Sequence, residues 1–105
     1  MRRMLINAPA QGDLAAIDGF LRFEKCNPQA ADHFADEVHH AYDVIYGNPL
    51  AFKTCPDRHL SACGYRAVSV MRYILIYRYD EKADAVHVIR FFHELQDYAN
   101  ILLRC

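Results

Sequence analysis

The residues of this chain best suited to chemistry are one histidine and three arginines in its second half. The imidazole of His93 can donate or accept a proton near neutral pH. With Arg66, Arg78 and Arg90 nearby, it could form a small nuclease site in which cations stabilise the charge on a phosphate. In the alternative, structural interpretation, His93 ends a strand and hydrogen-bonds locally, while Arg66 and Arg78 pair with carboxylates on the sheet. We favour the structural interpretation for each residue taken singly.

A second group of polar residues has the spacing of metal ligands on a helix. Its members follow one another at i, i+3, i+4 and i+7: His33, Asp36, Glu37 and His40. A solvated helix face explains this pattern equally well, and no residue of another element completes a ligand set. We therefore expect no metal and no cofactor.

The cysteines are expected to be free thiols. Cys26, Cys55, Cys63 and Cys105 are scattered without C-x-x-C spacing, and disulfides are rare in a reducing compartment. Cys63 could be a nucleophile, but no histidine neighbours it in the sequence, so a structural role is favoured. Cys105 ends the chain and is expected to be exposed.

Length and composition indicate one globular domain, residues 1–105. The chain has 105 residues, of which 53% are hydrophobic and 24% charged, so a single packed core is expected. No apolar run approaches the roughly 20 residues of a membrane span. The N-terminal apolar run is also too short for a secretory signal, so a cytoplasmic protein is expected.

The charge distribution argues against nucleic acid as the main partner. The pI is about 6.6, whereas phosphate binding usually requires a concentrated basic surface. Residues 1–50 carry four basic and seven acidic side chains, and residues 51–105 carry eight and six. The first half is therefore acidic and the second half mildly basic.

A predicted β-hairpin is the centre of the fold. Two runs of mostly apolar residues, 65–79 and 85–92, are separated by the charged turn 80–84. In residues 73–79 nearly every side chain is β-branched, aromatic or aliphatic, which favours a central strand covered on both faces. The tight link Met71-Arg72 divides the first run into two strands.

The last predicted strand, residues 86–92, also positions one of the arginines. Strict alternation along a strand would place Arg90 on the face of three apolar residues: Val86, Val88 and Phe92. This placement predicts a covered stem and an exposed guanidinium head for Arg90.

Two helices are predicted before the hairpin, over residues 9–23 and 28–46. In both, apolar residues follow one another at intervals of three or four residues, the period of an α-helix. Asn27 can cap the second helix, with Pro28 at its first position. Because a turn of only four residues joins them, the helices should lie antiparallel and cover one face of a sheet.

Short elements complete the predicted order. A first strand is expected at residues 3–7, an optional short strand at 59–62, and a short final helix within 94–104. The predicted fold class is α+β with the order β-α-α-β-β-β. An antiparallel sheet packs against an N-terminal helical hairpin, and the short C-terminal helix is optional.

Several motifs in this order resemble the RelE/ParE superfamily of type II toxin–antitoxin toxins. They cover almost the whole chain: residues 9–17, Gly64-Tyr65-Arg66, Tyr73-x-x-x-Tyr77-Arg78, residues 88–93, Asp97 and Leu102. The resemblance implies a cytoplasmic toxin from a toxin–antitoxin (plasmid stabilisation) module, held inactive by a cognate antitoxin.

The superfamily has two main activities, and the end of the pattern favours one of them. RelE-like toxins are ribosome-dependent mRNA endoribonucleases with several converging cations. Here Ile74 stands where those nucleases place an arginine, and the final strand runs into His93-Glu94-Leu95 in place of a Lys-Arg pair. The ending His93-x-x-x-Asp97 resembles ParE-like toxins, which the resemblance implies bind and inhibit DNA gyrase without catalysis.

We therefore expect a ParE-like toxin that binds gyrase and has no catalytic residue. The target-binding candidates are Arg66, Arg78, Arg90 and His93. The alternative is a RelE-like endoribonuclease acting on the ribosome, with His93, Arg66 and Arg78 as its catalytic residues. A third interpretation is a degenerate toxin that only binds an antitoxin.

The resemblance also implies how the antitoxin binds. A disordered antitoxin segment would fold over the helical hairpin and the sheet edge, which requires exposed apolar side chains on the toxin. The candidates are Phe20, Phe23, Tyr46 and Phe52. The acidic first half of the chain would suit a basic antitoxin segment. The toxin is expected to form a homodimer or a hetero-oligomer with the antitoxin. No membrane partner is expected.

Overall fold

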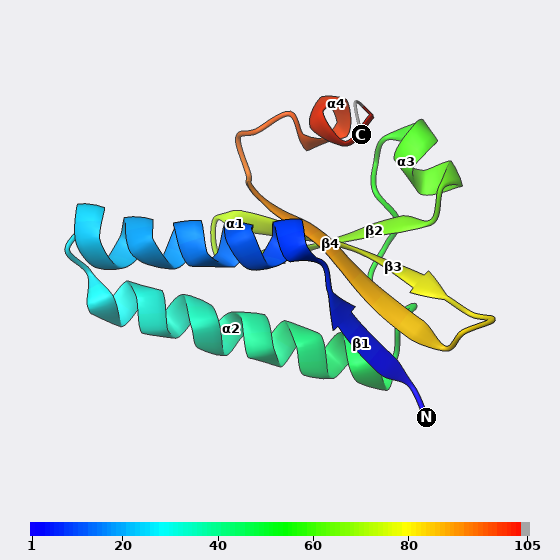
Figure 1. Cartoon of the computed structure of the whole chain (residues 1–105). Helices are drawn as coiled ribbons and strands as arrows, with labels where there is room; N and C mark the ends of the chain where they lie inside the picture. Colours follow the sequence, from blue (N-terminus) through cyan, green and yellow to red (C-terminus); the bar gives the residue numbers. More distant parts are fainter. Residues whose placement is uncertain (104–105) are drawn as a thin grey trace.

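A computed structural model describes residues 1–103, so Cys105 and the predicted end of the last helix lie outside the described residues. Within residues 1–103, four strands form a single sheet, and four α-helices and one π-helical turn accompany it (Figure 1). The elements are, in order, β1 (Arg3–Ile6), α1 (Ala8–Gly19), the π-helical turn η1 (Phe20–Glu24), α2 (Pro28–Gly47), α3 (Arg58–Ala62), β2 (Tyr65–Val70), β3 (Tyr73–Asp80), β4 (Ala85–His93) and α4 (Tyr98–Leu103).

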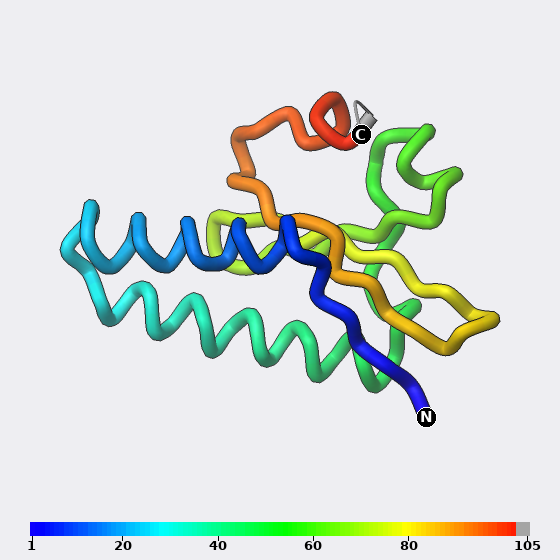
Figure 2. Tube along the Cα trace, viewed as in Figure 1, coloured from blue at the N-terminus to red at the C-terminus, as the bar shows by residue number. Residues whose placement is uncertain are grey.

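The sheet has the strand order β1-β4-β3-β2. Strands β2, β3 and β4 pair antiparallel as predicted, and β3 has a neighbour on each side, which confirms its central position. The first strand differs from the prediction because it pairs parallel to β4, so the sheet is mixed. Figure 2 shows this N-terminal strand running beside β4. Parallel pairing is feasible because almost the whole chain lies between the two strands.

The antiparallel helical hairpin covers one face of the sheet, as predicted (Figure 1). Phe34 of α2 packs edge-to-face against Tyr73, with 5.1 Å between the ring centroids. The Asn27 side chain accepts a hydrogen bond from the Ala30 N–H (3.1 Å), which confirms the predicted cap of α2. The predicted first helix is shorter than expected, because α1 ends at Gly19 and the chain continues as η1.

A second apolar cluster covers the other face of the sheet. Its buried members come from the connection before α3, from α3 and α4, and from the strands beneath them: Cys55, Leu60, Ile76, Phe92 and Leu102. The prediction of a strand at residues 59–62 is wrong: these residues belong to the short helix α3. The Asp57 side chain accepts a hydrogen bond from the Leu60 N–H (3.0 Å), which caps that helix, and Leu60 turns into the cluster.

A β-bulge in β4 changes the face on which Arg90 lies. Arg90 pairs with Ile76, but the next ladder pair joins Val88 to Tyr77, so Ile89 has no partner on β3. The extra residue reverses the alternation beyond it. Val88 therefore packs under the helices, whereas Arg90 and Phe92 lie on the opposite face, and the predicted shared face is wrong.

The three described cysteines are free thiols, as expected. Cys55 is buried, and burial raises the pKa of its thiol to about 11. Within residues 1–103, no helix is long and apolar enough to cross a membrane.

Candidate functional site

The strand register separates the predicted catalytic residues. His93 pairs with Tyr73 at one end of β3, whereas Arg66 pairs with Tyr77, four positions further along. Arg78 lies five positions from Tyr73, roughly 17 Å at about 3.3 Å per residue. Because Tyr73 and Tyr77 face the helices, alternation puts Arg78 on the other side of the sheet. The described strands therefore do not bring His93, Arg66 and Arg78 to one phosphate.

Arg90 is engaged within the fold. Its guanidinium donates two hydrogen bonds to the Asp13 carboxylate of α1, at 2.7 and 3.1 Å, and lies 5.1 Å from the centre of the Phe92 ring. The same carboxylate accepts the backbone N–H of Phe91 at 3.0 Å. Asp13 thus fastens α1 to the part of β4 that extends beyond β1. Sequence reasoning missed Asp13, since 77 residues separate it from Arg90.

Arg66 and Arg78 line one end of the sheet, in a surface that we call the arginine hollow. It has a volume of about 410 Å³ and is lined by Leu50, Gly64, Arg66, Arg78, Tyr79, Asp80, Glu81 and Lys82. Arg66 donates to the Phe52 carbonyl at 2.7 Å. Within residues 1–103 no carboxylate forms an ion pair with Arg66 or Arg78, so the expected pairing is absent there. Two acidic residues nevertheless line the hollow, which limits its net positive charge.

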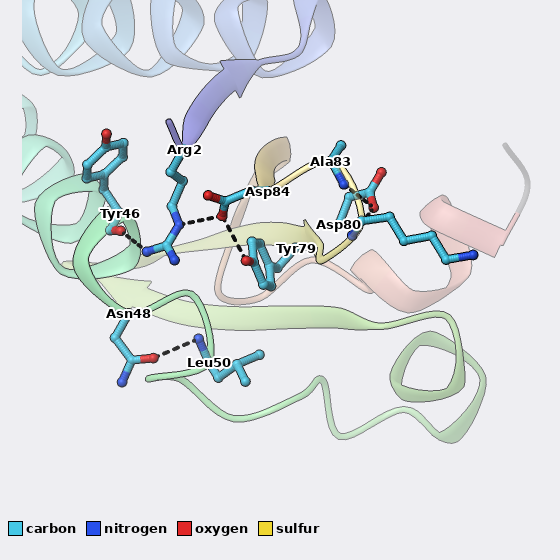
Figure 3. Close-up of polar contacts among 9 residues, drawn as sticks. Arg2, Tyr46, Asn48, Leu50, Tyr79, Asp80, Ala83 and Asp84 are labelled. Atoms are coloured by element: carbon cyan, nitrogen blue, oxygen red, sulfur yellow. Dashed lines mark hydrogen bonds and ion pairs between the residues drawn. The ribbon is translucent and has the colours of Figure 1, made fainter.

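A polar cluster next to this hollow ties the N-terminus to the rest of the fold (Figure 3). Arg2 pairs with Asp84 at 2.8 Å and donates to the Tyr46 carbonyl at the end of α2. The Tyr79 hydroxyl donates to the same Asp84 carboxylate at 2.8 Å. Hydrogen bonds from Arg2 and Tyr79 lower the pKa of Asp84. Arg2 therefore joins β1, the β3–β4 turn and α2, a role without a signal in the sequence.

His93 lies at the opposite end of the sheet, in a surface that we call the His93 cleft. The cleft has a volume of about 480 Å³ and is lined by Phe20, Leu21, Lys25, Met71, Arg72, Tyr73 and His93. The Nδ1 atom of His93 accepts a hydrogen bond from the Leu95 N–H at 3.2 Å, which is the local hydrogen bond expected at a strand end. In the neutral imidazole the proton therefore sits on Nε2, which can donate to a ligand.

A third surface, which we call the hairpin groove, runs between α1 and α2. It has a volume of about 340 Å³, and three alanines contribute to its wall: Ala15, Ala31 and Ala35. The Tyr42 hydroxyl is buried at this groove without a hydrogen-bond partner, and burial raises its pKa to about 12.

The four antitoxin candidates do not form one patch. Phe20 lines the His93 cleft, and Phe23 is 73% exposed in η1. Tyr46 lies near the opposite end of α2, and Phe52 is half-buried against Tyr77, with 6.5 Å between the ring centroids.

The metal-ligand spacing on α2 does not build a metal site in the described part of the chain. No group of three or more histidine, cysteine, aspartate or glutamate side chains is close enough there to hold a metal ion. The residues with this spacing, His33, Asp36, Glu37 and His40, are all exposed. They form a solvated helix face.

The sequence and the fold are both similar to those of known proteins. A model of the family described as ParE toxin of type II toxin-antitoxin system, parDE, matches residues 5–98. No curated protein matches the chain.

Two solved structures of toxin–antitoxin systems share the fold. The toxin-antitoxin complex RelBE2 from Mycobacterium tuberculosis has a chain that is 23% identical, with a TM-score of 0.59, over 88% of this chain and 96% of that chain. The chromosomal ParDE system from P. aeruginosa has a chain that is 15% identical, with a TM-score of 0.64, over 89% of this chain and 96% of that chain.

Proposed function

The chain belongs to the ParE toxin family of type II toxin–antitoxin systems, and from this premise we propose that it acts by binding DNA gyrase. In this proposal the toxin works in the cytoplasm without a catalytic site of its own. A cognate antitoxin neutralises it, and the pair serves as a plasmid stabilisation module.

The separation of the polar residues is the observation that carries the proposal. A nuclease needs a proton-transfer group and cations around one phosphate. His93 lies at one end of the sheet. Arg78 lies near the other end, on the face opposite the helices, and Arg90 forms an ion pair with Asp13. An arrangement of scattered polar groups and open clefts suits recognition of another protein better than bond cleavage.

The hairpin supports the antitoxin part of the proposal. Both solved structures described above come from toxin–antitoxin systems. Helix α2 carries four carboxylates and no lysine or arginine, and it borders the apolar hairpin groove, so it is complementary to a basic segment with apolar side chains.

An antitoxin segment that contacts both Phe23 and Tyr46 must span the length of α2. A helix of 20 residues such as α2 is about 30 Å long, and Phe23 and Tyr46 lie near its two ends. An extended segment of roughly ten residues covers this length. We therefore propose a segment that follows α2 from Phe23 to Tyr46.

Controlled expression in bacteria with and without the antitoxin tests the proposal. We expect growth arrest that the antitoxin relieves, inhibition of supercoiling by purified gyrase, and intact mRNA on translating ribosomes. An otherwise identical chain with two exposed charges reversed away from all three surfaces, K53E/R58E, is the matched control and should behave like the wild type.

Each other outcome points to a different function. Cleavage of ribosome-bound mRNA that His93→Ala abolishes, with ribosome binding retained, would establish the RelE-like alternative. Antitoxin binding without growth arrest would instead indicate a degenerate toxin.

A further inference from the structure

The His93 cleft concentrates exposed apolar side chains at one end of the molecule. Phe20 and Met71 in its wall are 40% and 42% exposed. Leu95, whose N–H donates a hydrogen bond to His93, is 85% exposed. Exposed apolar side chains that gather around a cleft are typical of a surface that binds another protein.

Each wall of the cleft contains an unusual feature of the backbone: a π-helical turn in one and a left-handed residue in the other. Phe20 begins η1, and a π-helical turn is rare and often found at functional sites. Met71 has φ = 57° in the two-residue link between β2 and β3, where glycine or asparagine is usual. Proteins retain such local costs mainly where a function needs the side chain in place.

The rim of the cleft has the opposite charge to α2. Lys25, Arg72 and His93 line it, and the Lys25 ammonium lies 5.5 Å from the centre of the Phe20 ring. The Arg72 side chain is 81% exposed, and its ion pair with Glu94 is long, at 3.4 Å. A ligand carboxylate can replace such a surface contact at little cost in free energy. A basic segment complementary to α2 is therefore not complementary to the cleft.

We infer that the His93 cleft is where the toxin grips its target protein, through a target segment in which carboxylates flank an apolar side chain. The inference rests on the proposed function, because it assigns α2 and the hairpin groove to the antitoxin and leaves the cationic cleft to the target. It moves Phe20, an antitoxin candidate from the sequence, to the target-binding surface. The apolar side chain lies between Phe20 and Met71. The carboxylates accept hydrogen bonds from Lys25, Arg72 and the Nε2–H of His93.

Two variants test the cleft without removing buried side chains. K25E/R72E reverses two exposed charges and should weaken target inhibition about 10- to 100-fold, as expected for reversed charge pairs at an interface. Met71→Gly should lower inhibition about fivefold by removing apolar contact. It should leave the thermal midpoint unchanged or higher, because glycine suits a positive φ. K53E/R58E makes the same charge change away from the cleft and is the control.

Growth arrest and antitoxin co-purification are measured together for each variant. The inference is supported if both cleft variants lose growth arrest, still bind the antitoxin, and the control retains both properties. Cleft variants that still arrest growth, or that lose the antitoxin, would overturn it. If the wild type arrests growth but leaves gyrase active, the proposal that gyrase is the target fails. The role of the cleft is then still tested by whether the cleft variants lose growth arrest.

A direct titration decides the question if the wild type arrests no growth. The probe is a synthetic decapeptide in which glutamate alternates with leucine and phenylalanine, and the control peptide has lysine in place of glutamate. Only the glutamate peptide should shift the NMR signals of Phe20 and Met71. Equal shifts with both peptides, or none with either, would contradict the inference.

Discussion

Replacing Asp13 with alanine should destabilise this fold strongly for a change outside the apolar core. The carboxylate accepts three hydrogen bonds, two from Arg90 and one from the Phe91 N–H. The Asp13 and Arg90 side chains are only 18% and 29% exposed, so water replaces these bonds poorly. Breaking a fully buried pair costs 3–5 kcal/mol, and for this partly exposed one we expect about 3 kcal/mol of unfolding free energy.

Urea denaturation of matched variants measures this loss. Asp13→Asn keeps an acceptor for the Phe91 N–H and should lose about half as much as Asp13→Ala. The control is Asp18→Ala, which breaks an i,i+4 pair with Arg22 in which Asp18 is 45% exposed and should cost at most about 0.5 kcal/mol. If Asp13→Ala cost no more than the control, the carboxylate would not fasten α1 to β4.

Three further changes have definite signs. Tyr42→Phe removes the buried, unpartnered hydroxyl and should raise the unfolding free energy by about 1 kcal/mol. Because burial raises the Tyr42 pKa to about 12, the wild type should lose stability between pH 10 and 12, and the variant should lose less over that range in urea titrations. The folded state lowers the pKa of Asp84 below its ordinary value of 3.8, so the ionised carboxylate stabilises the fold above that pH and stops doing so on acidification. The difference in unfolding free energy between the wild type and Asp84→Asn should therefore disappear below pH 4, as measured by thermal melts in acid. Asp57→Ala removes the cap of α3 and should cost about 1 kcal/mol, measured by thermal unfolding.

Much of the fold was predictable because its signals are local. The strand 73–79, the helix capped by Asn27 and the tight link after Val70 each follow from a few neighbouring side chains. The prediction of a strand at residues 59–62 fails because the helix there depends on the Asp57 cap and on burial of Leu60. Five residues carry too little periodicity to distinguish a helix from a strand.

The sequence by itself determined the α+β class, the antiparallel hairpin strands and the helical pair, because residue periodicity specifies which side chains share a face. Only the tertiary structure decided which distant side chains come together: Asp13 pairs with Arg90, and Phe20, Met71 and His93 line one cleft. The face on which Arg90 lies depends on the bulge at Ile89, and the mixed sheet depends on the parallel addition of β1 to β4. A bulge or a strand position is selected by the packing of the whole core, so no short stretch of sequence contains it.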